Sequence, residues 1–203
     1  MRRMLLIFAI AVFSTRPVSG KEKELPKITI GAEWGYMPTF FHGYDYNFLD
    51  TEGFREIGHE ADLKYFSNGE VTLHAGYNFN SRWNLSLHAG YAGIAGFQPV
   101  IPFSIRATRY WSEDYLADGW FSFMDIGSGI CLKKEPQEIA SCKIGSGYRI
   151  SLSRTTKLDF ITAVRGIYTH PEIKYYNERV PLERIRYSNG YAISLFFGLG
   201  LTF

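Results

Sequence analysis

The last thirteen residues, YAISLFFGLGLTF (Tyr191–Phe203), are the stretch that decides the fold of this chain. Large apolar side chains occupy every second position, from Tyr191 to Phe203. The positions between them hold small or polar residues, with Phe196 as the exception. Successive side chains of an extended strand point to opposite faces of a sheet. The stretch therefore predicts a β-strand with one wide apolar face and one narrow face.

The same alternation recurs upstream through most of the chain, and no segment after Lys27 shows helical periodicity. The clearest further segments are 28–36, 71–79, 83–91, 147–152 and 158–168, with weaker ones at Phe103–Tyr110 and Trp120–Cys131. The sequence predicts about eight strands, each long enough for the roughly 9–11 residues that a tilted membrane strand requires.

Composition excludes several other classes of protein. The 203 residues are 17% aromatic, 46% hydrophobic and only 21% charged, which is too aromatic and too weakly charged for a disordered chain. Two cysteines are too few for a small fold held together by many disulfides. A formal net charge of +2 is too small to indicate nucleic-acid binding.

The N-terminal segment has the pattern of a secretory signal peptide. Basic Arg2 and Arg3 precede the apolar run Met4–Phe13, and the small residues Val18-Ser19-Gly20 follow. The apolar run is shorter than the roughly 20 residues that a membrane-spanning helix needs. We therefore expect residues 1–20 to be a cleaved signal peptide and residues 21–203 to form a single domain.

Period two alone does not say which face of the strands meets water. In a soluble lipocalin-like binder or sandwich the apolar face points inward, whereas in a membrane barrel it points to lipid. Three features favour the barrel: many apolar faces end in aromatic residues, the opposite faces are rich in glycine and serine, and connection lengths alternate. Short turns are expected at Asn80–Arg82 and Ser153–Lys157, and long connections at His42–His59 and His170–Asn189. Ser112–Gly119 is long for a connection on the short-turn side.

On these residues the chain resembles the small outer-membrane β-barrels of the OmpA/OmpX type. The signal peptide, the alternation and the terminal strand ending in Phe203 carry the resemblance. It implies an antiparallel, up-and-down transmembrane barrel that is monomeric and needs no cofactor. It also implies export through the periplasm to the outer membrane of a Gram-negative bacterium, contact with outer-membrane lipid, and recognition of Phe203 by the barrel-assembly machinery.

Two histidines are expected to face each other inside such a barrel. Leu73–Tyr77 and Leu87–Tyr91 share the sequence LHAGY. A hairpin turning at Ser81 pairs residues whose numbers sum to 162, which brings His74 opposite His88, about 4.5–5.5 Å apart at Cβ. Two histidines could hold a metal ion, but the spacing supplies no third ligand. We therefore expect a polar pair and no metal site.

Several charged residues share the inward parity of these histidines. Isolated charges facing a narrow interior must pair, because burying an ion without a partner costs several kcal/mol. We expect an ion-pair network that closes the barrel, formed with the two histidines by Glu33, Arg106, Arg149, Asp159 and Arg165. The alternative is the lining of a small-solute pore, although an eight-stranded barrel has an interior only wide enough for side chains.

An enzymatic role has one weak sequence signal. Some small outer-membrane barrels that deacylate lipid A carry a His-x-Ser-Asn segment near the C-terminus, and this chain has Arg186-Tyr187-Ser188-Asn189 at the corresponding place. Arginine stays protonated and cannot accept a proton from serine. His170 could replace it only through an unusual fold, so we predict no catalytic residues.

Cys131 and Cys142 flank the polar segment Leu132–Ser141 and could oppose each other in a hairpin. An exported protein meets an oxidising compartment. A disulfide or two free thiols both fit the sequence, because the strand register decides between them.

The two long connections combine aromatic and charged residues, which suits recognition of an extracellular protein, a glycan or a lipid headgroup. The alternation of residue types at every second position continues into His170–Asn189, at Ile173–Tyr176. This pattern favours the alternative that the strands simply extend above the membrane. We therefore expect an outer-membrane barrel with a plugged polar interior and a structural, recognition or adhesion role.

Overall fold

The computed structural model describes residues 26–63, 65–94, 98–132, 138–176 and 178–203. The expected signal peptide lies outside these residues. The described chain is almost entirely β-strand, with one short 3₁₀ turn, η1 (Leu182–Arg184). No helix in these segments is long and apolar enough to cross a membrane.

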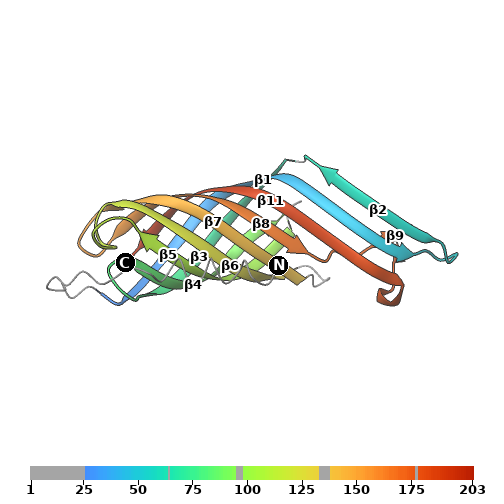
Figure 1. Ribbon diagram of the computed structural model, residues 1–203, viewed down its shortest axis with the longest axis horizontal. Coiled ribbons are helices and arrows are strands. Elements are labelled where there is room, and N and C mark those ends of the chain that lie inside the picture. The colour runs from blue at the N-terminus through green and yellow to red at the C-terminus, as the bar shows by residue number, and fades with distance from the viewer. Residues whose placement is uncertain (1–25, 64, 95–97, 133–137, 177) are drawn as a thin grey trace, which may run out of the picture.

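Eight strands form a closed antiparallel barrel, which confirms the predicted fold class (Figure 1). Each strand pairs with its neighbour along the chain, and β1 pairs with β11 to close the sheet. The barrel strands are β1 (Ile28–Leu49), β3 (Phe66–Asn78), β4 (Trp83–Ile94), β5 (Gln98–Tyr110), β6 (Gly119–Cys131), β7 (Glu138–Ser151), β8 (Lys157–Thr169) and β11 (Ile185–Thr202).

The apolar faces of the strands point away from the barrel axis, as the sequence predicts. On β11 the side chain of Phe197 is 51% exposed, whereas Ser194 and Phe196 are buried. Directly opposite residues of an antiparallel pair share a face, so the pairing of Phe197 with Tyr36 and Thr162 carries the outward face to both neighbouring strands. A soluble barrel with an apolar interior is therefore excluded as the arrangement of these strands.

Exposed aromatic rings gather near both ends of the barrel. Tyr77, Phe79, Trp111, Trp120 and Phe203 lie beside the turns at the end that holds the C-terminus. At the other end the exposed rings include Tyr36, Phe40, Tyr91 and Tyr168. Amphipathic rings prefer the two membrane–water interfaces, so these positions match the girdles of a membrane barrel.

The connections at the end with the C-terminus are short and held by side-chain hydrogen bonds. Asn80 Oδ1 accepts hydrogen bonds from the backbone N–H groups of Arg82 and Trp83. Ser153 Oγ accepts them from Thr155 and Thr156. Side chains of this kind replace backbone partners in tight turns, and both predicted turns are confirmed.

The segment between β5 and β6 is longer because it fills the mouth of the barrel. Tyr115 is only 1% exposed and packs with Tyr110, Phe121 and Phe123 of the interior. Asp114 Oδ1 accepts hydrogen bonds from two backbone N–H groups of this segment. The connection acts as a stopper as well as a turn, which accounts for its unusual length.

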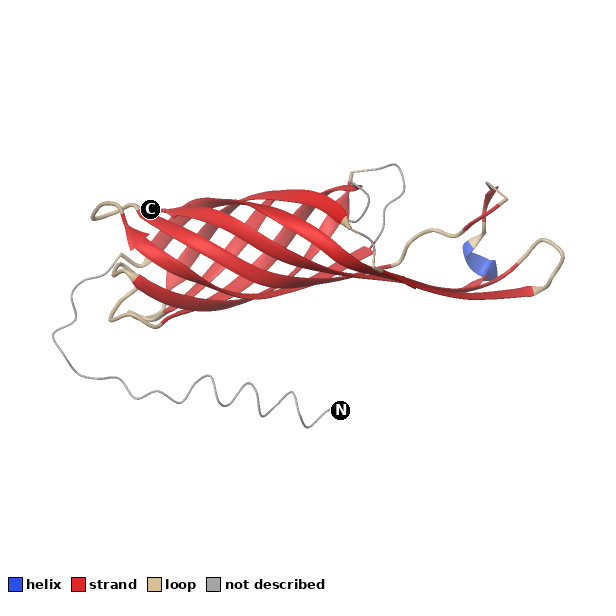
Figure 2. Ribbon diagram, turned by 90° about the horizontal axis from the view of Figure 1, so that it is seen from above, coloured by secondary structure: helices blue, strands red, loops and turns tan. Residues whose placement is uncertain are grey.

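At the opposite end two strands continue past the barrel. β1 has 22 residues, a span of roughly 70 Å at about 3.3 Å per residue. Its outer part pairs with β2 (Arg55–Asp62) on one side and with β11 on the other. These three paired strands form a projection that extends from the barrel (Figure 2), and we call residues 42–62, 171–176 and 178–190 the arm.

The arm replaces the two long connections expected at His42–His59 and His170–Asn189. Extended strands occupy residues 42–49, 55–59 and 185–189 of these ranges, as the alternative predicts. The predicted rung at Ile173–Tyr176 is instead part of a small separate hairpin formed by β9 (Lys174–Tyr175) and β10 (Glu178–Arg179).

A register shift at Phe40 determines which side chains of β1 pack in the core of the arm. Thr39 pairs with Ser194 and Phe41 with Ile193, so Phe40 is an extra residue in β1. Beyond this bulge the even-numbered residues continue the inward face of the barrel. Tyr44, Tyr46 and Phe48 then pack with Tyr175, Ile173 and Val180 as a small core of the arm.

Candidate functional site

The interior of the barrel holds a chain of buried ion pairs. Arg149 on β7 faces Asp159 on β8, and its Nε and Nη2 donate hydrogen bonds of 2.6 Å to the two carboxylate oxygens. Arg149 Nη1 also donates to the carbonyl oxygen of Tyr115, at 2.8 Å. The pair therefore links the barrel wall to the stopper segment.

A second cluster lies around Arg106 on β5. Its Nη1 donates a 2.5 Å hydrogen bond to Glu33 Oε1, and its Nε and Nη2 donate to Asp125 Oδ2 at 3.2 and 3.1 Å. All three side chains are buried, and the guanidinium lies 4.3 Å from the centre of the Phe123 ring. One arginine is thus shared by two carboxylates.

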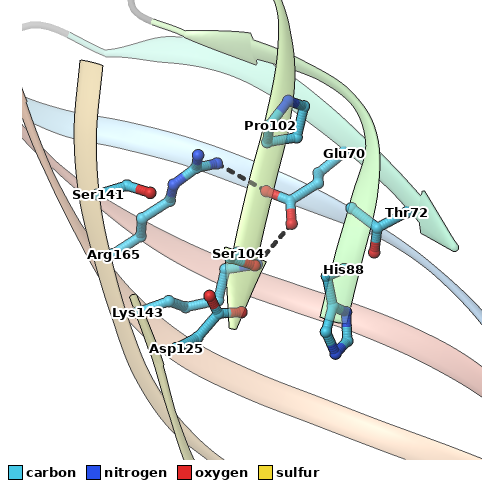
Figure 3. A pocket seen from close by; sticks show the side chains of 9 residues that line it. All are labelled: Glu70, Thr72, His88, Pro102, Ser104, Asp125, Ser141, Lys143 and Arg165. Carbon is cyan, nitrogen blue, oxygen red and sulfur yellow. Dashed lines mark hydrogen bonds and ion pairs between the residues drawn. The ribbon is translucent and has the colours of Figure 1, made fainter. Parts of the chain in front are cut away.

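The third cluster has the opposite composition, with one carboxylate shared by two cations. Glu70 accepts hydrogen bonds from Lys143 Nζ at 2.5 Å and from Arg165 Nη1 at 2.7 Å (Figure 3). Arg165 Nη1 also contacts Met37 Sδ at 3.3 Å, and Lys143 Nζ lies 4.5 Å from the Phe196 ring centre.

These eight charged side chains balance, because four are acidic and four are basic. The third cluster borders a cavity of about 10 Å³, which is room for about one water molecule. The geometry fits the predicted plug.

The two histidines meet as the hairpin register predicts. His74 pairs directly with His88, and their rings stack with centroids 4.9 Å apart and planes at 26°. His88 Nε2 lies 3.0 Å from Ser86 Oγ. The His74 ring occupies the space beside Gly31, where a Cβ would lie only 2.5 Å from its Cε1 atom.

The structure places the seven side chains that the sequence pattern assigns to the interior on the inward face: Glu33, His74, His88, Arg106, Arg149, Asp159 and Arg165. That prediction missed Glu70, Asp125 and Lys143, which complete the ion pairs. The signal was present, because each of the three is next to an outward-facing apolar residue: Val71, Met124 and Ile144 are all exposed.

The mouth at the arm end is closed by an apolar layer of buried side chains: Ile94, Val100, Ile139, Ile167 and Ala192, with half-buried Cys131 beside them. Above this layer, a cavity of about 240 Å³ opens at the base of the arm between Tyr44, Tyr191 and Pro171. Both mouths are therefore obstructed, one by the Tyr115 stopper and the other by these aliphatic side chains.

The Ser188 segment has no catalytic arrangement. Ser188 Oγ donates a hydrogen bond to the carbonyl oxygen of Pro171 and lies 3.3 Å from Tyr44 Oη. His170 is nearby, but its Nδ1 donates to the carbonyl oxygen of Ser188, at 2.8 Å, rather than contacting the hydroxyl. Among the described residues, the hydrogen bonds of the Ser188 hydroxyl involve Pro171 and Tyr44 and no basic side chain, and Asn189 Oδ1 accepts from Tyr168 Oη at 2.8 Å.

The two cysteines are free, and the disulfide left open by the sequence does not fit the fold. Cys142 pairs with the outward-facing Ile126, whereas Cys131 packs against the inward apolar layer. The two side chains therefore lie on opposite faces of the barrel wall. They are also separated by about five residues along the strands, roughly 17 Å, which far exceeds disulfide geometry.

Comparison with known proteins supports the fold and adds no family. No protein-family model matches the chain, and no curated protein matches its sequence. Among solved structures, the outer membrane protein OprG from Pseudomonas aeruginosa is similar with a TM-score of 0.53 and 11% identity, over 87% of this chain and 96% of that one.

Two further solved structures are similar with lower TM-scores. Neisserial surface protein A matches with a TM-score of 0.40 and 8% identity, over 87% of this chain and 97% of its own. The outer membrane protease OmpT from Escherichia coli matches with a TM-score of 0.34 and 10% identity, over 91% and 99%. The chain has the fold of an outer-membrane β-barrel with eight transmembrane strands.

Proposed function

We propose that this protein is a sealed outer-membrane anchor that presents its arm for recognition of an extracellular protein or glycan. One observation carries the proposal: buried ion pairs and packed apolar side chains fill the barrel interior, while two barrel strands continue into a separate three-stranded projection. A barrel whose interior is packed with side chains is poorly suited to solute transport. A folded projection with its own core presents an ordered surface to which a partner can bind.

The direction of the arm follows from the asymmetry of the connections. Bacterial outer-membrane barrels have short periplasmic turns and longer extracellular extensions. The turns near Asn80 and Ser153 and the C-terminal Phe203 share one end, and the arm leaves from the other. This arrangement supports an extracellular arm.

The surface of the arm has the composition of a recognition surface. Phe54 is 65% exposed and Tyr176 is 85% exposed, and Ile57 and Leu182 are also exposed. Charged side chains such as Arg55, Glu56 and Arg184 surround them. Large rings beside charged groups provide contact area and orientation in protein and glycan recognition.

The proposal includes a monomer held in outer-membrane lipid and inserted by the barrel-assembly machinery. The ring of Phe203 is exposed at the end of β11, and its backbone N–H and carbonyl pair with Ile30 at 2.7 and 3.1 Å. An aromatic residue whose backbone is fixed by the sheet and whose ring is exposed supports this part of the proposal.

Conductance tests whether the barrel is sealed. The purified protein in planar lipid bilayers is expected to show no stepwise current. Stable unitary conductance steps in the parent protein would contradict a sealed barrel and favour a pore.

Cysteine labelling tests the direction of the arm. In a background carrying Cys131→Ala and Cys142→Ala, Phe54→Cys at the arm tip is compared with Arg154→Cys at the opposite turn. Both positions are exposed. A membrane-impermeant maleimide should label Phe54→Cys on intact cells and Arg154→Cys only after permeabilisation. The reverse pattern would place the arm in the periplasm.

Binding tests recognition itself. Cells displaying the protein are applied to a glycan array and to a panel of immobilised extracellular proteins. A variant carrying Phe54→Ser, Tyr176→Ser and Leu182→Ser is expected to bind the ligand identified on the array or panel at least tenfold more weakly than the parent. The variant Arg154→Ser is expected to bind it like the parent. Binding that is equal in the triple variant and the parent would remove the arm as the recognition surface.

A further inference from the structure

Glu33, His74 and His88 lie together inside the barrel, although they come from three strands and from distant parts of the sequence. His74 on β3 pairs with Gly31 of β1 on one side and with His88 of β4 on the other. Glu33 lies two residues along β1 from Gly31, on the same inward face. One potential ligand atom from each side chain lies within 4.8 Å of the other two.

Each of the three side chains has one buried polar atom without a hydrogen-bond partner: Glu33 Oε2, His74 Nδ1 and His88 Nδ1. Leaving such an atom buried and unpaired costs about 1–3 kcal/mol, so native interiors rarely tolerate several together. In Glu33 and His88 the other polar atom is engaged, by Arg106 and Ser86 respectively. The three open atoms point to a missing shared partner.

We propose that these residues form a binding site for a divalent transition-metal ion of the zinc type. Two imidazoles and one carboxylate are a ligand set that zinc accepts, with a fourth position left for water. Mg²⁺ and Ca²⁺ prefer oxygen ligands throughout, and Cu(I) prefers sulfur, so the nitrogen-rich set discriminates against them.

The surrounding residues orient the ligands as outer-sphere groups do in metal sites. When His88 Nε2 carries the proton it donates to Ser86 Oγ, which leaves the lone pair of Nδ1 free for a metal. Arg106 holds one oxygen of Glu33 and leaves the other free. Gly31 provides the space in which the His74 ring lies.

A metal ion must be accommodated by the charge of the whole interior. Glu33, Arg106 and Asp125 carry one excess negative charge, and the neighbouring Glu70, Lys143 and Arg165 carry one excess positive charge, with Lys143 directly opposite Asp125. Both carboxylates keep a partner when the metal binds Glu33 Oε2. The ligand atoms lie within 4.8 Å of one another, against roughly 3.3 Å between ligands of a tetrahedral zinc ion. Because a metal ion lies in the plane of each imidazole that binds it, the His74 and His88 rings must turn out of their stacked arrangement when the metal binds.

Metal content after refolding tests the site directly. The full chain is refolded into detergent micelles with one equivalent of Zn²⁺, desalted, and analysed by elemental mass spectrometry, with the folded fraction measured by gel mobility before and after boiling. The parent is expected to retain about one zinc per folded chain. His74→Asn and Glu33→Gln should each reduce retention at least tenfold.

His59→Asn is the matched control, because His59 is an exposed histidine of the arm and lies outside the cluster. It should retain the metal like the parent. If the parent retains no zinc, the open atoms are served by water only and the proposal is overturned. Unchanged retention in His74→Asn and Glu33→Gln, or an equal loss in His59→Asn, overturns it as well.

A second measurement covers variants that do not fold. Co²⁺ replaces Zn²⁺ in the parent protein, and its visible absorption reports the coordination geometry. An intense tetrahedral spectrum with nitrogen and oxygen ligands supports the site, and the weak spectrum of hydrated Co²⁺ overturns it. Neither measurement depends on the recognition function proposed for the arm.

Discussion

Arg149 and Asp159 are joined by two parallel hydrogen bonds of 2.6 Å across the pairing of β7 and β8, and both side chains are buried. This bidentate geometry is the strongest form of a carboxylate–guanidinium contact. Because the guanidinium also binds the carbonyl oxygen of Tyr115, the pair fixes both the barrel wall and the stopper at its mouth.

Removing one member of this pair should cost more than removing both. Arg149→Met leaves Asp159 buried without its partner, and we expect a loss of about 3–5 kcal/mol in the free energy of unfolding. The double variant Arg149→Met/Asp159→Leu should lose less than Arg149→Met alone. Urea unfolding in lipid vesicles measures both, and additive losses would show that the pair is not coupled.

Two glycines provide a matched test of how tightly the interior is filled. A Cβ at Gly147 would overlap the ring of Phe121 and the carbonyl oxygen of Phe160, whereas a Cβ at Gly166 meets nothing within 4 Å. Gly147→Ala should therefore lower the free energy of unfolding by about 1–3 kcal/mol through overpacking. Gly166→Ala should change it by less than about 0.5 kcal/mol. Equal effects would contradict the assigned faces.

Introducing an arginine on the outer surface tests whether that part of the surface faces lipid or water. Leu87 is 63% exposed in the middle of β4, and Ile57 is exposed on the arm. Leu87→Arg should lose about 2–4 kcal/mol in vesicles, because the charge enters hydrocarbon. Ile57→Arg should be nearly neutral. If Leu87→Arg is also neutral in vesicles, that part of the wall is in contact with water.

The stopper segment should give the protein a small acid sensitivity. The backbone N–H of Ser151 donates to Asp118 Oδ1 at 2.7 Å and holds the pKa of Asp118 below its ordinary value of 3.8. A lowered folded pKa stabilises the protein above the unfolded pKa, and this contribution disappears as the pH falls through the folded value.

Asp118→Asn should therefore flatten the decline of the unfolding midpoint below about pH 4, the ordinary range of an aspartate. The exposed Glu113→Gln is the control, and it should leave the slope unchanged. An Asp118→Asn profile that follows the parent through this range would show that the titration of Asp118 contributes nothing to the acid sensitivity.

Much of the site could be predicted because strand parity is a local property. The alternation around Arg149, Asp159 and Arg165 places each side chain inward without any knowledge of its neighbours. The LHAGY repeat and the short turn at Ser81 were enough to pair His74 with His88. The same parity would have found Glu70, Asp125 and Lys143.

Other features depended on register and curvature, which no single strand reveals. The bulge at Phe40 reverses the parity of β1, so the pattern of Trp34 and Tyr36 does not predict where Tyr44 and Tyr46 point. Cys131 and Cys142 resemble a hairpin pair in the sequence, but the register places them on opposite faces of the wall.

The sequence by itself determined that the strands have an apolar outer face and a more polar inner face. Successive side chains of a strand point to opposite faces, so the order of the residues assigns each one to a face. Only the tertiary structure decided which inward charges meet, that Glu33 joins His74 and His88, and that β1 and β11 rise beyond the barrel as an arm. Those relationships depend on the stagger between strands that closes the sheet, and stagger is a property of the whole barrel.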